Sequence, residues 1–247
     1  MASSVEFEFK TRLVSPVLVV GFPGVGNVGG LTVSYIIEKS GANLMASFYS
    51  DVFPAQVIVD EDSVPKLLSH DLWHMCSNGR DILLLTGPVQ PPTSEGQYSL
   101  SEFEFSTLLD LGITEVISIG GYTKGQPQET QRILGLVSDP DMKPSLEEKG
   151  VVFVPNEPMG GVVGGAAMFL GLSRRHGIRC TGLMGETFGL INDFRSASQV
   201  VSCLCDILDL ELDQKDIKDA ASKVELLNGI VPEGAKSQVL VDLSYIG

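Results

Sequence analysis

Short apolar runs that end at glycine or proline alternate along this chain with longer stretches of helical periodicity. This alternation is typical of a parallel or mostly parallel sheet with helices on both faces. Strands buried on both sides read as continuous apolar runs, so such runs are the candidates for central strands. The sequence therefore predicts an α/β fold, with central strands at Val17–Val20, Ile82–Leu85, Val116–Ile119 and Val151–Val154 and further strands at Leu44–Ser50, Gln56–Val59 and Thr181–Met184.

Helical periodicity, with caps or glycine stops, occupies the segments between these runs. The predicted helices are Asn27–Ser40, Leu100–Leu111, Ala166–His176, Ser196–Leu208 and a last one that opens at Asp213 and continues through Val224. Residues Gln126–Ser145 are predicted to be an irregular insertion, and Val239–Gly247 to be extended. Because no linker or repeat divides the chain, we expect one domain over residues 1–247, with a helical C-terminal part from about residue 196.

Composition narrows the class of protein. Lys and Arg total 17 against 31 Asp and Glu, which gives a net charge of -14 and disfavours binding to nucleic acid or anionic membranes. A hydrophobic fraction of 43% with 19% charged residues argues for a folded chain. The four cysteines are scattered, which favours reduced thiols, and neither Met1–Lys10 nor Pro158–Ser173 fits a signal peptide or a membrane span. We therefore expect a cytoplasmic protein.

The glycine-rich segment from Gly21 to Gly30 follows the first predicted strand and precedes the first predicted helix. Gly24, Gly26 and Gly29 match the G-x-G-x-x-G pattern of dinucleotide-binding loops, and Asp51 could then be a ribose-binding acid. However, the pattern starts three residues after the strand ends, and Pro23 removes a backbone donor. A turn that lets the helix pack tightly on the sheet is the favoured interpretation, and phosphate binding is the alternative.

Two further patterns resemble metal or catalytic sites. His70 and His74 are spaced as in a zinc-protease helix, with Cys76 as the third candidate ligand, but a polar, partly exposed strand or loop is favoured. Cys203 and Cys205 diverge on a helix and are predicted to be packing residues. The sequence predicts no metal site and no cofactor.

Glu157, Glu186 and Asp193 are isolated acids near glycine turns that could in principle serve as general acid and base. Capping or surface charge is the favoured role for each. No G-x-S-x-G nucleophile motif is present, so no catalytic residue is predicted.

Taken together, the turns resemble those of the proteasome assembly chaperone 2 family. Six segments match in order over nearly the whole chain, which is more specific than any single motif. They are Val19–Gly29, Gly87–Pro91, Ser118–Tyr122, Gly164–Ala167 with Gly171–Leu172, Gly182–Thr187, and the helix start at Asp193–Ala197.

The resemblance implies a three-layer α/β/α fold of phosphorylase/hydrolase type, in a protein that assists assembly of the proteasome core particle. It implies no catalytic residues. Members of the family can carry a C-terminal hydrophobic–tyrosine–any residue tail that enters pockets between α-subunits, and this chain ends Tyr245-Ile246-Gly247, with the tyrosine one position away from that pattern. An edge strand or an oligomer contact is the equally weighted alternative for this tail.

Our hypothesis is a cytoplasmic, homo-oligomeric, non-catalytic scaffold that binds proteasome α-subunits through Tyr245, Ile246 and Gly247. The acidic surface would steer it towards basic partners. The alternative is an enzyme or sensor that binds a small molecule, a nucleotide or a phosphate, where glycine turns gather beyond the strand ends. Its candidate ligand-binding residues are Gly21, Pro23, Gly24, Gly26, Gln90 and Pro91.

Overall fold

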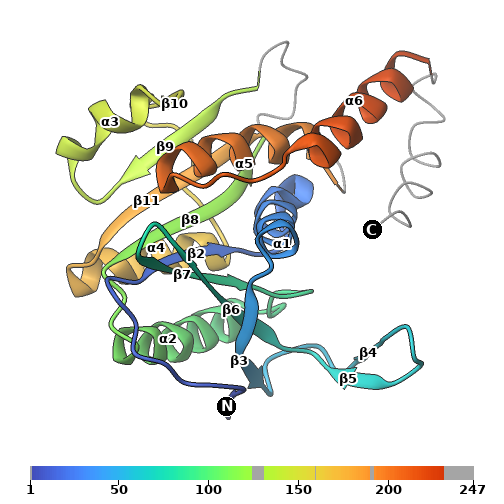
Figure 1. The fold of residues 1–247 in the computed structure, drawn as a ribbon, viewed down its shortest axis with the longest axis vertical. Helices are drawn as coiled ribbons and strands as arrows, with labels where there is room; N and C mark the ends of the chain where they lie inside the picture. Colours follow the sequence, from blue (N-terminus) through green and yellow to red (C-terminus); the bar gives the residue numbers. More distant parts are fainter. Residues whose placement is uncertain (1, 124–130, 159, 190–191, 231–247) are drawn as a thin grey trace.

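In the computed structural model, residues 2–123, 131–158, 160–189 and 192–230 are described. They form a nine-stranded mixed sheet of order β1-β3-β6-β7-β2-β8-β11-β9-β10 and a separate two-stranded hairpin (Figure 1). The sheet strands are β1 (Ser3–Phe7), β2 (Val17–Gly21), β3 (Asn43–Ser50), β6 (His70–Ser77), β7 (Arg80–Thr86), β8 (Glu115–Tyr122), β9 (Ile133–Val137), β10 (Val151–Val152) and β11 (Arg179–Glu186). The hairpin strands are β4 (Val57–Val59) and β5 (Pro65–Leu67).

The centre of the sheet is parallel and its margins are mostly antiparallel. Strands β7, β2, β8 and β11 run parallel to one another, whereas β1, β3 and β6 form an antiparallel extension on one side. Strand β9 is antiparallel to β11 and carries the short parallel β10 at the other edge. Carboxyl ends of the four parallel strands therefore meet at one end of the sheet, where α/β proteins commonly bind ligands.

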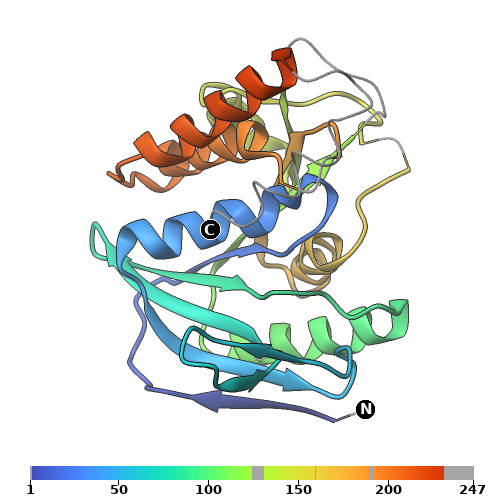
Figure 2. The same cartoon turned by 90° about the vertical axis from the view of Figure 1, so that its right-hand side faces the viewer.

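Helices cover both faces of the sheet, as the side view in Figure 2 shows. One layer holds α1 and α5 with α6 packed outside them, and the other holds α2 and α4. The predicted three-layer α/β/α arrangement is thus confirmed. The helices are α1 (Val28–Ser40), α2 (Ser94–Asp110), α3 (Lys143–Glu147), α4 (Gly165–His176), α5 (Phe194–Leu208) and α6 (Lys215–Ile230), with short 3-10 turns η1 (Val25–Asn27) and η2 (Pro140–Met142).

Alternation along the central strands divides the core into two apolar layers. Val17 and Val19 of β2 point towards α1 and α5, and Leu18 and Val20 point towards α2 and α4. All four are fully buried, which explains why β2 reads as a continuous apolar run. None of the described helices is long and apolar enough to cross a membrane.

Several predicted elements agree with the structure in type and differ in extent. The helix predicted at Leu100–Leu111 begins earlier, because the Thr93 side chain accepts a hydrogen bond from the Gly96 amide and caps α2. The cap predicted near Asp213 is confirmed by its hydrogen bond from the Lys215 amide, 2.9 Å long. The segment predicted to be extended, Val239–Gly247, lies outside the described residues.

Two predictions near the β9 edge were wrong. Residues within the expected irregular insertion Gln126–Ser145 form β9, η2 and the start of α3, because an apolar run at 133–137 pairs with β11. The run Val151–Val154 is not a central strand. Only its first two residues pair, at the sheet edge, and Val152 is 36% exposed. One-sided packing of Phe153 against Gly135 accounts for the apolar composition of this run.

The close approach of α1 to the sheet predicts opposite effects for two helical glycines. An alanine Cβ at Gly29 would lie 2.6 Å from the Ile119 carbonyl oxygen, whereas at Gly171 of α4 nothing lies within 4 Å. We expect Gly29→Ala to destabilise the fold by about 1–3 kcal/mol through overpacking. Gly171→Ala should stabilise it by about 0.5–1 kcal/mol through helix propensity. Urea denaturation measures both, and equal effects would contradict the packing role of Gly29.

Candidate functional site

A pocket of about 430 Å³ lies at the carboxyl end of the parallel strands. It is formed by the loop after β2, the end of β8, the loop after β7 and the glycine-rich segment before α4. The lining residues are Phe22, Gly24, Val25, Gln90, Gln97, Ile119–Thr123, Pro158, Gly161–Gly164, Ala166 and Met184. None of these lining residues carries a charge, so the pocket offers backbone groups, amides and hydroxyls together with apolar surface.

Glycines in the loop after β2 allow the backbone to pack closely. A Cβ at Gly21 would lie 2.5 Å from the Gly29 carbonyl oxygen, so strand β2 and helix α1 touch through their backbones. Gly26 and Asn27 then turn through left-handed conformations, with φ of 63° and 50°, before α1 begins. This geometry is the tight helix packing that the favoured interpretation of the glycine motif predicted.

Gln90 joins two walls of the pocket with a single side-chain amide. Its Nε2 donates to the Pro23 carbonyl at 2.6 Å, and its Oε1 accepts from the Gly165 amide at 2.7 Å. Gly165 is the first residue of α4, so this bond occupies one of the free N–H groups that an anion at the helix start would need. Gln90 thereby fixes the loop after β2 to the N-terminus of α4.

The turn at Gly26 is tied on its other side to the start of α5. The Asp193 amide donates to the Gly26 carbonyl at 2.9 Å, and the Asp193 carboxylate accepts from the Ser196 amide at 3.0 Å and from Thr187 Oγ1 at 2.6 Å. Asp193 is therefore the N-cap of α5, as the sequence predicted, and its carboxylate is held by hydrogen bonds within the fold.

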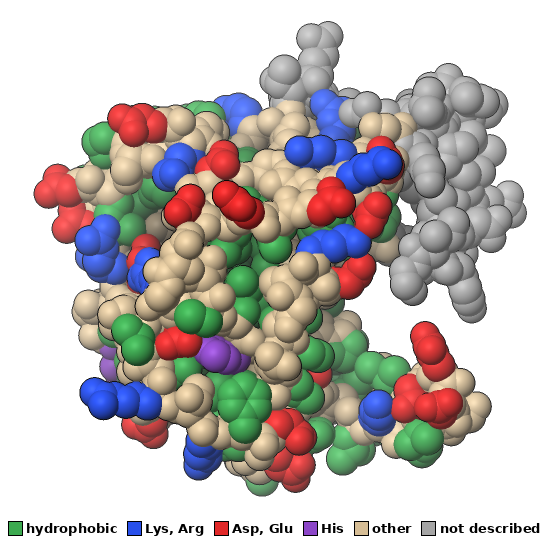
Figure 3. Space-filling model, in the orientation of Figure 1, with side chains coloured by type: hydrophobic (Ala, Val, Ile, Leu, Met, Phe, Trp, Pro, Cys, Tyr) green, Lys and Arg blue, Asp and Glu red, His purple; other side chains and the backbone are tan. Residues whose placement is uncertain are grey.

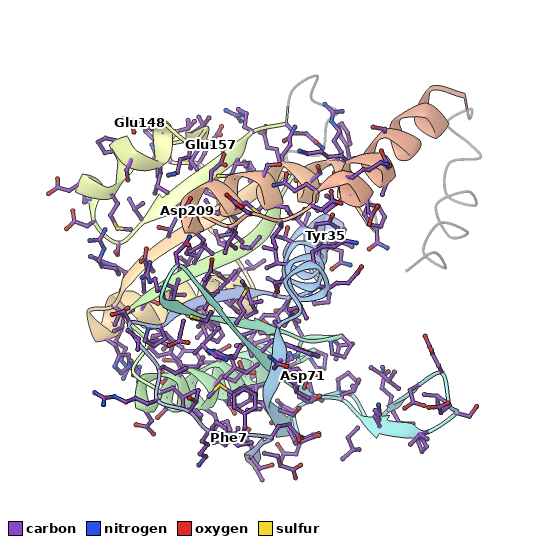
Figure 4. All side chains as sticks on the ribbon, in the orientation of Figure 1. Phe7, Tyr35, Asp71, Glu148, Glu157 and Asp209 are labelled. Carbon is purple, nitrogen blue, oxygen red and sulfur yellow. The ribbon has the colours of Figure 1, made fainter. Side chains whose placement is uncertain are left out.

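Glu186 and Glu157 converge on Arg132. The Arg132 guanidinium donates two bonds to Glu186, of 3.0 and 2.5 Å, and one of 3.2 Å to Glu157. These carboxylates raise the pKa of Arg132, and the hydrogen bond that its guanidinium donates to Glu186 is the largest contribution. Figure 4 shows Glu157 near β10, at the opposite edge of the sheet from Phe7 of β1. The expected role of capping or surface charge was wrong for Glu186: its side chain is buried, and the ion pair with Arg132 compensates the cost of burying the charge.

A buried His70–Glu104 pair lies behind the pocket. His70 Nε2 is 2.8 Å from the Val89 carbonyl, which can only accept, so Nε2 carries a proton. His70 Nδ1 is 2.6 Å from Glu104 Oε1, so a short hydrogen bond joins the two side chains. The imidazole also stacks on Phe22 of the pocket at 4.1 Å and meets Phe53 edge-on at 4.9 Å. The hydrogen-bonded His70 ring thus supports Phe22 on the side away from the pocket.

The zinc-protease spacing of His70 and His74 does not produce a metal site. Both lie on strand β6, where residues four apart are separated by roughly 13 Å. His70 pairs with Glu104, and His74 pairs with Asp81 at 2.6 Å. No group of three metal-ligating side chains occurs within the described ranges. The predicted strand is confirmed, but His70 is buried and not partly exposed, because Glu104 satisfies it.

The candidate ligand-binding residues are only partly brought together. Gly24 and Gln90 line the pocket, and Pro23 touches Gln90 but lines a separate groove of about 470 Å³ beside α1. Pro91 is buried, and its carbonyl accepts from Gln97 at 3.0 Å. Tyr245, Ile246 and Gly247 lie outside the described residues. The sequence interpretation missed Gln97, which no local motif marks, and it did not assign Tyr122 and Met184 to a site, although both lie in segments that match the family.

Three of the four thiols are packing residues. Cys180, Cys203 and Cys205 are buried, and burial raises the pKa of each, to about 11 for Cys203. Cys76 is exposed on β6. The predicted packing role of Cys203 and Cys205 is confirmed.

Removing one partner of the buried pair tests its structural weight. We expect Glu104→Ala to destabilise the fold by about 3–5 kcal/mol, because it leaves the buried His70 imidazole without the hydrogen-bond partner of its Nδ1 atom. Glu102 lies on the same helix and makes an exposed ion pair with Arg175. Glu102→Ala should therefore cost at most about 1 kcal/mol. Equilibrium urea denaturation of both variants measures the difference, and similar values would rule out the pair as a stabilising element.

The uncharged pocket predicts weak binding of anions. We expect neither phosphate nor nucleotides to raise the melting temperature, because Gln90 already occupies the α4 amide and no lining residue is charged. A ligand at a hundred times its Kd adds about 2.7 kcal/mol, and each kcal/mol raises Tm by about 2–4 °C in a chain of this size. A rise of that size with phosphate would favour the small-molecule alternative, and Gly24→Ala would then test the pocket as its location.

Comparisons with known proteins extend over most of the chain. A family model described as the PAC2 family matches residues 18–227. The curated protein MJ1210 of Methanocaldococcus jannaschii, which is uncharacterized, is 27% identical over 214 residues, which cover 86% of this chain and 81% of that protein.

Two solved structures from Pyrococcus furiosus have the same fold. PbaB, described as an archaeal proteasome activator, is 28% identical with a TM-score of 0.85, and the match covers 92% of this chain and 98% of PbaB. PbaA, described as an archaeal homolog of proteasome-assembly chaperone, is 22% identical with a TM-score of 0.75, over 93% and 96% of the two chains. With the family model matched from the first central strand into α6, this chain belongs to the PAC2 family.

Proposed function

We propose that this protein is a non-catalytic proteasome assembly chaperone that binds proteasome α-subunits in the cytoplasm. The likeness to PbaB, a proteasome activator, at 28% identity over 92% of this chain supports a proteasome partner. The observation that carries assembly as the role is membership of the PAC2 family together with the fold shared with PbaA, a homolog of proteasome-assembly chaperone. Fold alone does not define function, so the role in assembly is what the capture experiment below tests.

The contacts of the candidate acids Glu157, Glu186 and Asp193 support a non-catalytic role. Glu157 and Glu186 are both bound to Arg132, and Asp193 caps α5. A general acid or base must reach a substrate proton within hydrogen-bond distance, but these carboxylates are engaged with neighbours in the fold. Their geometry is that of structural ion pairs and a helix cap.

Charge and the C-terminal residues supply the proposed mode of binding. A net charge of -14 favours encounter with basic partner surfaces. We further propose that Tyr245, Ile246 and Gly247 contact the α-subunits, and that the protein acts as a homo-oligomer, which would present several such segments to a ring. Several linked contacts would raise the overall affinity without a new kind of contact.

Capture of cognate α-subunits tests this mode of binding. We expect deletion of Tyr245–Gly247, and also Tyr245→Ala, to weaken capture by about tenfold or more, as loss of an aromatic anchor does. Ser244→Ala is the matched control and should leave capture within about twofold. Surface plasmon resonance with immobilised α-subunits measures the affinities. Unchanged capture by the deletion variant removes the tail from the mechanism, and no capture by the intact protein refutes the chaperone proposal.

Activation of a finished proteasome is the second candidate, because PbaB is described as an activator. The two functions act on different substrates: free α-subunits for a chaperone and the complete core particle for an activator. Adding the protein to preassembled core particles and following peptide hydrolysis separates them. Faster hydrolysis by preassembled particles favours activation, and faster appearance of particles from free subunits favours assembly.

A further inference from the structure

The β4–β5 hairpin projects away from the body of the protein beside β3 and β6 (Figure 1). Its antiparallel register pairs Val57 with Leu67, Ile58 with Lys66 and Val59 with Pro65. Each of these side chains is exposed. A two-stranded hairpin is marginally stable by itself in water, so exposed apolar side chains on it are unusual unless they meet a partner.

One face of the hairpin is entirely apolar. Cross-strand partners and residues two apart share a face, which places Val57, Val59, Pro65 and Leu67 together. Val57, Val59 and Leu67 are 50%, 59% and 68% exposed. Ile58 and Lys66 form the opposite, mixed face. We call the first set the hairpin face.

The hairpin face continues into a groove of about 690 Å³. Val57 and Leu67 form one wall, and Tyr49, Phe53 and Ala2 belong to the other side. The groove therefore joins the hairpin to the edge of the main sheet, where β1 has no neighbouring strand on its outer side among the described elements. An extended chain segment fits such a site, because sheet edges offer unpaired backbone groups.

Most charged side chains around the hairpin face and its groove are acidic. Residues 49–68 contain Asp51, Asp60, Glu61 and Asp62 against one cation, Lys66, and that cation is bound to Asp60 at 3.0 Å. Asp60 also accepts from the amides of Asp62 and Val64. Figure 3 shows the acidic side chains gathered on the projecting hairpin, with apolar side chains beside them.

We propose that the hairpin face and its groove bind an extended polypeptide segment with alternating apolar side chains and flanking Lys or Arg residues. The apolar side chains pack against Val57, Val59 and Leu67, and the basic flanks meet the acids at the hairpin tip. Backbone pairing is favoured along β4, because Pro65 removes one donor from β5. A second copy of this chain fits less well, since it brings the same acidic tip and a net charge of -14.

This binding surface goes beyond the proposed function. It lies on the β1–β3 side of the fold and involves no residue of the Tyr245–Gly247 segment. Recognition of such a segment at this surface requires no proteasome. The two proposals can therefore fail independently.

A labelled synthetic peptide of alternating valine and threonine with lysines at both ends provides the probe, and fluorescence anisotropy with the full chain measures its Kd. We expect Val59→Ser and Leu67→Ser each to weaken binding about tenfold, because each substitution removes an apolar side chain that the bound peptide would bury. Ile58→Ser, on the opposite face of the same hairpin, is the matched control and should change the Kd by less than about twofold. Replacing the flanking lysines by glutamates, or raising the salt concentration, should also weaken binding.

Three results overturn the proposal. Equal losses for Ile58→Ser and Leu67→Ser would mean that the hairpin face is not the contact. Equal affinity for the lysine-flanked and glutamate-flanked peptides would refute the charge argument. Absence of peptide binding, together with a smaller sedimentation mass for Leu67→Ser than for the unaltered chain, would assign the face to a second copy. Circular dichroism melts establish that the variants, all at exposed positions, remain folded.

Discussion

Backbone contact between β2 and α1 is the constraint on which the other contacts at this end of the fold depend. Gly21 and Gly29 have no side chains, so the helix sits directly on the strand and on the Ile119 carbonyl of β8. That contact fixes where the loop from Phe22 to Gly24 crosses the sheet end. Gln90 can then reach both this loop and α4, and the Asp193 amide can reach Gly26. This one turn thereby fixes the positions of α4 and α5, which lie on opposite faces of the sheet.

Periodicity predicts those elements whose burial follows from local sequence. Strand β2 and helix α5 were predicted almost to their ends, because their apolar residues face the core on a regular repeat. Strand β9 was missed because it is short and its pairing partner, β11, lies more than forty residues later in the chain. Val151–Val154 was misplaced because an edge strand packed on one side can be as apolar as a central one.

Only part of the candidate site could likewise be predicted from the sequence. The glycine turn was found from its place after a predicted strand, and Gln90 from the segment Gly87–Pro91 that matches the family; both lie at one end of the sheet. Partners that depend on three-dimensional proximity were not found: Arg132 with Glu186, and His70 with Glu104, are 54 and 34 residues apart. A carboxylate that appears isolated in the sequence is therefore weak evidence for a surface position.

His70 has a mechanical consequence for both surfaces of the molecule. Its ring touches Phe22, which lines the pocket at the strand ends, and Phe53, which lines the groove beneath the hairpin. The ring itself is anchored at both nitrogens, to Glu104 of α2 and to the Val89 carbonyl. Neither phenyl ring can move inward without straining those two bonds. The pocket and the groove therefore share one rigid support, although their lining segments come from distant parts of the chain.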